Sequence, residues 1–307
     1  MPPASKNEFP TTVEIIEVGP RDGLQREPVI IPVAQKVALI NALVDAGLKR
    51  IQVTSFVHPR LVPQMADAEA LCAQLTHHPD VQYSGLALNL KGIERAYAAG
   101  IKHIDVSVSA SEAHSLRNAN RTVSEALAEY DKMVDRARSC NMTVRGGIQC
   151  AFGYLDPADV DPQTVVNIAS HFLNELDVDE LALADSSGMA NPIQLTNLLQ
   201  MIVPMSNGKP VILHLHDTRG MGLANVMAAM RSGVYTFDTS FGGLGGCPFI
   251  TDATGNIATE DTVYMLEQMG IETGVDLQKL AHIAQDLERL LGKPTLPGKL
   301  YKLLLPA

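Results

Sequence analysis

Cysteine is scarce in this 307-residue sequence, which has four, at positions 72, 140, 150 and 247. No two of them form a CxxC pair, and a chain of this length can bury enough apolar surface to fold without disulfide bonds. Long apolar runs are also missing, because no stretch reaches 18 uninterrupted apolar residues. The first eight residues lack the apolar core of a signal peptide. We therefore expect a cytoplasmic protein in a reducing compartment, without a membrane segment.

Positive charge is in deficit. The sequence has 24 Lys and Arg against 34 Asp and Glu, which gives a formal net charge of -10 and a pI near 5.3. Because nucleic acids and anionic membranes are bound through clustered Lys and Arg, this balance argues against both as partners. Hydrophobic residues make up 46% of the chain, which is typical of a soluble globular protein with a large core.

Short apolar runs rich in β-branched residues recur along the chain. We expect strands over residues 14–19, 50–56, 82–89, 103–109, 143–152, 180–186, 210–217 and 235–241. Between them, apolar residues at helical spacing predict helices over residues 33–46, 124–139, 162–176, 192–203 and 222–232. Eight alternating strand and helix units favour a closed parallel (β/α)8 TIM barrel over an open sheet.

The end of the sequence has a different pattern. After Gly270, leucine and isoleucine recur with helical period from Leu277 to Leu290. We expect additional C-terminal helices that pack against the barrel. The predicted organisation is thus an N-terminal extension (residues 1–12), a catalytic barrel (13–270) and a C-terminal helical region (271–307).

Polar residues follow the first strand, where a TIM barrel carries its active site. Arg21 and Asp22 place a cation and a carboxylate side by side at the barrel mouth. The alternative is a simple ion pair within a turn. Arg26 could contact a phosphate of an anionic ligand or lie in solvent.

The seventh strand ends with two histidines, His214 and His216. Side chains two residues apart on a strand point to the same face, so both imidazoles can reach one metal ion. A His-x-His pair can equally be a pair of core residues. Oxygen ligands from Asp22 and Asn256 would favour a hard divalent ion, Mg²⁺ or Mn²⁺, over structural zinc.

The eighth strand runs into a glycine-rich loop, in which residues 242–248 read GGLGGCP. This loop could be a barrel-closing turn or a phosphate-binding nest. We favour a functional loop, because Cys247 lies beyond the strand in a flexible segment that can bring its sulfur to a substrate. The other three cysteines are expected to be structural.

These motifs resemble those of the 3-hydroxy-3-methylglutaryl-CoA (HMG-CoA) lyases, within the wider group of metal-dependent TIM-barrel lyases and acyl synthases. The similar segments span nearly the whole chain and lie at residues 17–25, 54–56, 62–65, 89–92, 110–112, 214–218, 243–248 and 255–261. The Arg-Asp-Gly turn and the His-x-His pair are shared by the whole group. The GLGGCP loop is more specific to the lyases.

The resemblance implies a role for individual residues. The implied ligands of the divalent metal are Asp22, His214, His216 and Asn256. The implied catalytic positions are Arg21, Asp185 and Cys247, with His214 as a further candidate. Asn118 and Arg26 are the residues implied or expected to lie near bound CoA. The family also implies a homodimer and a role in leucine degradation.

The implied reaction is a metal-assisted retro-Claisen cleavage of HMG-CoA into acetyl-CoA and acetoacetate. Arg21 would stabilise the enolate oxygen. Asp185 or His214 would accept the hydroxyl proton, and we favour Asp185 because a metal-bound imidazole is a poor base. Cys247 would protonate the acetyl-CoA enolate.

One position departs from the family pattern. The family usually has a glutamate where this chain has Gln52, which keeps the size and loses the charge. A related substrate is therefore an alternative, such as citramalyl-CoA, methylmalyl-CoA or a longer 3-substituted hydroxyglutaryl-CoA. Two further rivals are an acyl synthase that condenses acetyl-CoA with a 2-oxo acid, and a CoA-binding protein without activity.

Overall fold

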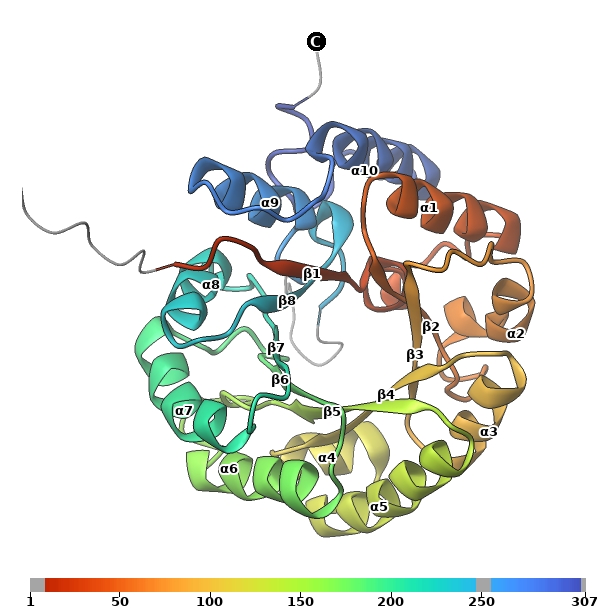
Figure 1. Ribbon diagram of the computed structural model, residues 1–307. Helices are drawn as coiled ribbons and strands as arrows, with labels where there is room; N and C mark the ends of the chain where they lie inside the picture. Colours follow the sequence, from red (N-terminus) through yellow and green to blue (C-terminus); the bar gives the residue numbers. More distant parts are fainter. Residues whose placement is uncertain (1–8, 247–254, 305–307) are drawn as a thin grey trace, which may run out of the picture.

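Eight parallel strands close into a barrel, which confirms the predicted TIM-barrel fold. The computed structural model describes residues 9–246 and 255–304. The strands are β1 (Glu14–Glu17), β2 (Arg50–Ser55), β3 (Gln82–Ala87), β4 (His103–Ser109), β5 (Thr143–Gln149), β6 (Glu180–Ala184), β7 (Val211–His214) and β8 (Thr236–Thr239). Each pairs with its neighbour in sequence, and β8 pairs with β1, so the ring seen in Figure 1 is closed.

Helices surround this ring of strands (Figure 1). They are α1 (Val33–Asp45), α2 (Ala68–Cys72), α3 (Leu90–Ala98), α4 (Glu112–Ala119), α5 (Val123–Ser139), α6 (Pro162–Ser170), α7 (Pro192–Met205), α8 (Gly222–Arg231), α9 (Thr259–Gln268) and α10 (Leu277–Leu291). The five helices predicted between the strands of the sequence are present. The predicted helix over residues 162–176 is α6 followed by one π turn, His171–Glu175.

Local sequence signals explain where several helices begin and end. Thr122 and Glu125 form a capping box before α5, in which the Glu125 amide donates to the Thr122 hydroxyl at 3.2 Å. The Asp276 carboxylate accepts from two amides at the start of α10. Gly292 ends α10 in the left-handed region with φ 63°, where glycine is favoured.

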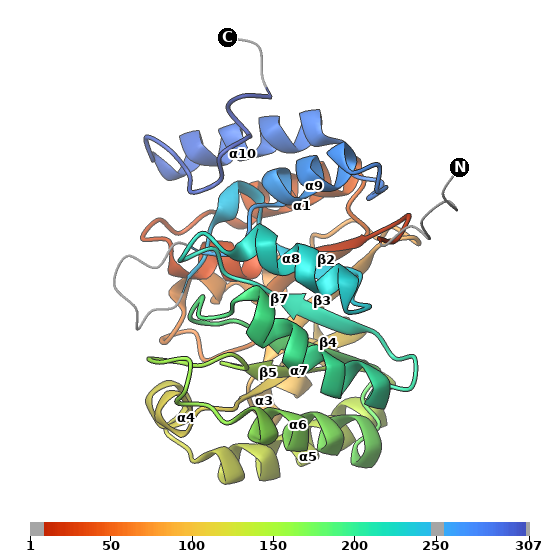
Figure 2. The same cartoon turned by 90° about the vertical axis from the view of Figure 1, so that its left-hand side faces the viewer.

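The C-terminal helix α10 lies outside the ring, against α1 and α9 (Figure 2). Its buried side chains Leu280, Ile283 and Leu287 recur at helical spacing and form the packed face. Helix α9 completes the eighth strand and helix unit. We retain the division at residue 270 between barrel and C-terminal region as a proposal.

Apolar and polar packing are separated in the barrel. One continuous apolar core fills the space between strands and helices. A smaller apolar group, which includes Ile16, Ala182 and Ile212, lies on the inner face of the strands. Above and below this group the interior carries charged side chains. Within the described residues, no helix combines the length and apolar character needed to cross a bilayer.

Candidate active site

The predicted site residues meet at the carboxyl ends of the strands. After β1, the chain makes a single π turn, Gly19–Gly23, that presents Arg21 and Asp22. The segment around Asn256 reaches the same place because Gly255 crosses the backbone of Gly245. A Cβ atom at Gly255 would lie 2.5 Å from that backbone, so only glycine allows this approach.

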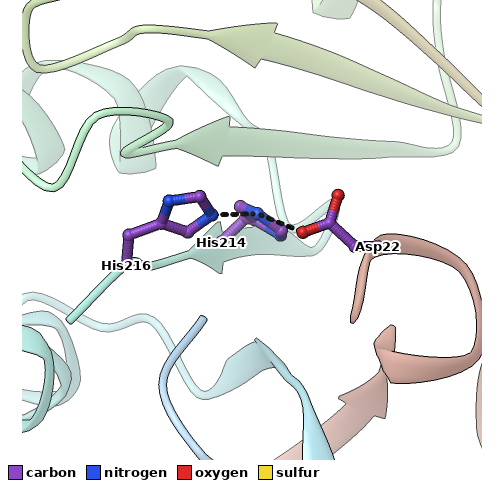
Figure 3. Close-up of side chains that lie close together, drawn as sticks. All are labelled: Asp22, His214 and His216. Atoms are coloured by element: carbon purple, nitrogen blue, oxygen red, sulfur yellow. Dashed lines mark hydrogen bonds and ion pairs between the residues drawn. The ribbon is translucent and has the colours of Figure 1, made fainter. Parts of the chain in front are cut away.

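Asp22, His214 and His216 converge on one point (Figure 3). One ligand atom from each lies within 4.8 Å of the others. The Nε2 atoms of the two histidines are 3.1 Å apart, and His214 Nε2 lies 3.9 Å from the Asp22 carboxylate. This spacing suits a single metal ion held by two imidazoles and a carboxylate.

The electrostatics of these side chains favour metal-binding forms. Burial raises the pKa of Asp22, but Arg21 and the two histidines outweigh it and hold the pKa at about 2, so the carboxylate is ionised. Burial, with the neighbouring His214, lowers the pKa of His216 to about 3 and keeps its imidazole neutral. Asp238 lies 3.0 Å from His214 Nδ1 and can hold the proton on that nitrogen, which leaves Nε2 free to bind metal.

Asn256 completes the candidate ligand set. Its amide nitrogen donates to Asp22 at 2.8 Å and to the Leu244 carbonyl at 2.9 Å, which fixes the orientation of the amide. Its Oδ1 atom is buried and has no hydrogen-bond partner in the described part of the chain. A buried unpartnered oxygen is costly, and a hard divalent cation would satisfy it. The four residues therefore fit Mg²⁺ or Mn²⁺.

A cavity of about 670 Å³ opens beside this cluster. Six of the predicted site residues line it: Arg21, Asp22, Arg26, Asn118, His214 and His216. Arg26 and Asn118 are exposed at its mouth, where a long ligand would leave the barrel. Arg26 also donates to the Gly246 carbonyl at 2.9 Å, so it links the turn after β1 to the glycine loop.

Asp185 is placed differently from the other candidates. Its neighbours Ala184 and Ser186 line the cavity, but Asp185 is not among the described residues that do so. Its Oδ1 atom accepts from the amides of Met189 and Ala190 at 2.7 and 3.2 Å. Burial raises its pKa to about 6. The carboxylate is thus mainly ionised at neutral pH, yet it supports a turn instead of facing the cavity.

Cys247 lies outside the described residues. The described chain stops before it at Gly246, which lines the cavity. Of the other three cysteines, Cys140 and Cys150 are buried and Cys72 is partly buried.

Sequence reasoning missed three charged residues under the metal cluster: Asp105 on β4, Arg145 on β5 and Asp238 on β8. All three are at most 5% exposed and line the cavity. Arg145 forms ion pairs with both carboxylates, and its Nε atom lies 3.3 Å from Asp105. The available signal was that each of these three strands contains one Asp or Arg residue.

Comparison with known proteins gives one consistent family. The HMGL-like family model matches residues 12–287. Hydroxymethylglutaryl-CoA lyase YngG of Bacillus subtilis is 42% identical over 291 residues, covering 95% of this chain and 97% of the relative. The mitochondrial hydroxymethylglutaryl-CoA lyase of Homo sapiens is 39% identical over 292 residues, covering 95% of this chain and 90% of the relative.

Solved structures agree with this result. An HMG-CoA lyase from Acinetobacter baumannii, in complex with coenzyme A and 3-methylmalate, superposes with a TM-score of 0.91 at 38% identity, covering 95% of both chains. An HMG-CoA lyase from Pseudomonas aeruginosa gives a TM-score of 0.92 at 39% identity, covering 97% of this chain and 98% of the other. Because the family model and these relatives extend over nearly the whole sequence, the chain belongs to the HMGL-like family.

Proposed function

We propose that this protein is a carbon–carbon lyase that cleaves HMG-CoA into acetyl-CoA and acetoacetate. The observation that carries this proposal is the convergence of Asp22, His214 and His216 beside a cavity that Arg21 also lines. Relatives about 40% identical over nearly the full length are named as HMG-CoA lyases, which supports the same reaction here.

Asp22, His214, His216 and Asn256 would hold a divalent metal. When bound, Mg²⁺ or Mn²⁺ would lower the pKa of the substrate hydroxyl and orient its oxygens. Arg21 stands on the cavity wall next to Asp22, where its guanidinium would stabilise negative charge on the thioester oxygen as the enolate forms. This charge stabilisation is needed only in the transition state, so it should act on kcat.

Two side chains were candidates for accepting the hydroxyl proton. His214 lines the cavity, and Asp238 beside its Nδ1 would balance a positive charge on the ring. Asp185 holds the turn that follows β6, and its own amide donates to the His214 carbonyl at 2.8 Å. We therefore assign Asp185 a positioning role and keep His214 as the candidate acceptor that lines the cavity. Because its Nδ1 carries a proton, His214 would accept on Nε2 only when that nitrogen is not bound to the metal, which Asp22, His216 and Asn256 would then hold.

The remaining roles rest on the resemblance. Cys247 would deliver a proton to the acetyl-CoA enolate, and it directly follows the cavity-lining Gly246. Arg26 and Asn118 would meet the CoA moiety at the cavity mouth. A cytoplasmic location, a homodimer and a role in leucine degradation are further parts of this proposal.

A related acyl-CoA is the second candidate substrate. Gln52 lines the cavity in place of the usual glutamate, and it changes the charge beside Arg21. The Acinetobacter baumannii relative was solved with coenzyme A and 3-methylmalate, a smaller acid than the acyl group of HMG-CoA.

The test is release of the short acyl-CoA product by the reduced protein with Mg²⁺ or Mn²⁺, which is acetyl-CoA from HMG-CoA or citramalyl-CoA and propionyl-CoA from methylmalyl-CoA. HMG-CoA, citramalyl-CoA and methylmalyl-CoA are offered in parallel, each with an EDTA control. Preferred cleavage of HMG-CoA that EDTA abolishes is the expected result. Cleavage of another thioester alone would replace the substrate, and turnover that is insensitive to EDTA would contradict the metal-assisted reaction.

A further inference from the structure

Gln52 lies between a cation and a carboxylate at the bottom of the cavity. The Nε atom of Arg21 donates to its side-chain oxygen. Its side-chain nitrogen donates to Asp105 Oδ2 at 2.6 Å. Gln52 is 2% exposed and Asp105 is 5% exposed, so the contact between them is largely shielded from bulk water.

The orientation of the Gln52 amide is fixed by its two partners. A guanidinium can only donate hydrogen bonds and an ionised carboxylate can only accept them. Only one of the two amide orientations satisfies both neighbours. Asp105 therefore determines that the amide oxygen, and not the amide nitrogen, faces Arg21.

Asp105 is itself held from two other sides. The Ser84 hydroxyl donates to the same oxygen, Oδ2, at 2.8 Å. Arg145 Nε lies 3.3 Å from the other oxygen and forms an ion pair with it. These contacts come from β3 and β5, so the carboxylate is anchored to the rigid barrel. A side chain that is fixed in this way can position its neighbours.

We propose that Asp105 is a positioning residue for Arg21 and acts through Gln52. The negative charge below Arg21 is on Asp105. The neutral Gln52 connects the two residues, because its amide nitrogen donates to Asp105 and its amide oxygen accepts from Arg21. The Arg21 guanidinium also forms an ion pair with Asp22. The hydrogen bond to Gln52 is therefore the second contact that fixes its position. The inference rests on the proposed function only for the role of Arg21 in the reaction.

The test is a pair of single variants and their combination. In Asp105→Val, the Gln52 amide nitrogen loses its acceptor and the hold on Arg21 is released. A misplaced catalytic group costs about tenfold to hundredfold in kcat. Gln52→Glu should also lower kcat, because it sets a second carboxylate against Asp105 at the present 2.6 Å contact.

The double variant Gln52→Glu with Asp105→Val should recover kcat to within about fivefold of wild type. It contains one carboxylate, at position 52, which can accept directly from Arg21. KM should change less than kcat in all three variants, because charge on the enolate develops only during reaction. A kcat of Asp105→Val within about twofold of wild type, or a double variant no better than the worse single variant, would overturn the proposal.

Glu180→Gln is the matched control. Glu180 forms a partly buried ion pair with Arg50 at 2.6 Å, and it lies at the opposite end of the barrel. This variant should lower the melting temperature and leave kcat unchanged. If Asp105→Val behaves in the same way, with lower stability and normal kcat, Asp105 is structural only.

A second readout needs neither substrate nor metal. The Nε–H signal of Arg21 in ¹⁵N-edited spectra, assigned by its absence in Arg21→Lys, should exchange slowly in wild type. Exchange should be faster in Asp105→Val and slow again in the double variant. Unchanged exchange in Asp105→Val would overturn the inference. If this pattern is found but no thioester is cleaved, the proposed function fails and the positioning of Arg21 by Asp105 stands.

Discussion

The two ends of the barrel interior both contain buried charges, but the charges are arranged differently. At the amino ends of the strands, Arg50 bridges Glu14 and Glu180 at 2.9 and 2.6 Å, and His103 lies 3.4 Å from Glu180. Every charge in this group has an opposite charge beside it. Such pairs tie strands together, because removing one partner leaves a buried charge unpaired.

At the carboxyl ends of the strands, some side-chain atoms that can accept a hydrogen bond lack a donor. Asn256 Oδ1 has no partner in the described part of the chain, and two imidazole Nε2 atoms face each other at 3.1 Å. Burial alone therefore does not identify a functional site. A functional site is indicated instead by ligand atoms that converge on one point beside a cavity, where one added cation would satisfy all of them at once.

Removing a histidine from the carboxyl end should have the largest effect. We expect His216→Ala to lower kcat by about a thousandfold and to abolish Mn²⁺ binding. In wild type, Mn²⁺ at 100 times its Kd should raise the free energy of unfolding by about 2.7 kcal/mol. Calorimetric melting with and without Mn²⁺ measures this stabilisation, which the variant should lose.

His103→Ala is the matched control for that experiment, because His103 is a buried histidine at the amino end. It should keep the stabilisation by Mn²⁺. A loss of Mn²⁺ binding in both variants would break the comparison between the two ends.

The next effect is on stability and comes from the amino end. Burial raises the pKa of Glu180, but His103 and Arg50 outweigh it and hold the pKa at about 2. We expect Glu180→Gln to lower the free energy of unfolding by about 3 kcal/mol. Because the native pKa is depressed, this difference should be full above the unfolded pKa near 4.5 and shrink as the pH falls towards 2. Urea unfolding at several pH values measures it; a kcat reduced more than about threefold would contradict a purely structural role.

A variant of Glu260 tests whether a carboxyl group with a raised pKa near the site takes part in the reaction. Burial raises its pKa to about 8, and Glu17 adds to the shift. Its carboxyl accepts from the Gly242 amide at 3.0 Å, at the base of the glycine loop. The native state keeps a proton that the unfolded state releases above pH 4.5, so stability should fall by about 1.4 kcal/mol per pH unit up to pH 8.

The side chain in Glu260→Gln is neutral at every pH. Between pH 6 and 8, the free energy of unfolding of this variant should fall less steeply than that of wild type, by about 1.4 kcal/mol per pH unit. The variant should keep its activity at pH 7. An identical pH dependence in variant and wild type would show that Glu260 is ionised in the native protein.

Much of the fold could be predicted from the sequence because each strand and most helices carry their own period of apolar residues. Helix α9 was missed, since few apolar residues mark its buried face, chiefly Val263 and Leu266. The meeting of Asp22 with His214 and His216 was predictable, because barrel topology brings all carboxyl ends of the strands together. The ion pair between Arg145 and Asp238 was not predictable. The two residues are 93 positions apart, and the alternation of strands and helices does not say which two charged side chains will pair.

Asp185 shows the same limit, and its expected effect is the smallest. The sequence placed it near the end of the predicted strand over residues 180–186, but the direction of its side chain depends on whether the following turn offers amides, as Met189 and Ala190 do. Asp185→Asn keeps an oxygen that can accept from both amides and removes the charge. If Asp185 positions the turn, kcat should fall less than about tenfold, and Asp185→Ala should lower both kcat and the melting temperature further. A loss in Asp185→Asn of about a hundredfold or more, with normal stability and normal Mn²⁺ binding, would instead make Asp185 the proton acceptor. It would also show that a group outside the cavity lining can take part in the reaction, which the comparison of the two barrel ends does not predict.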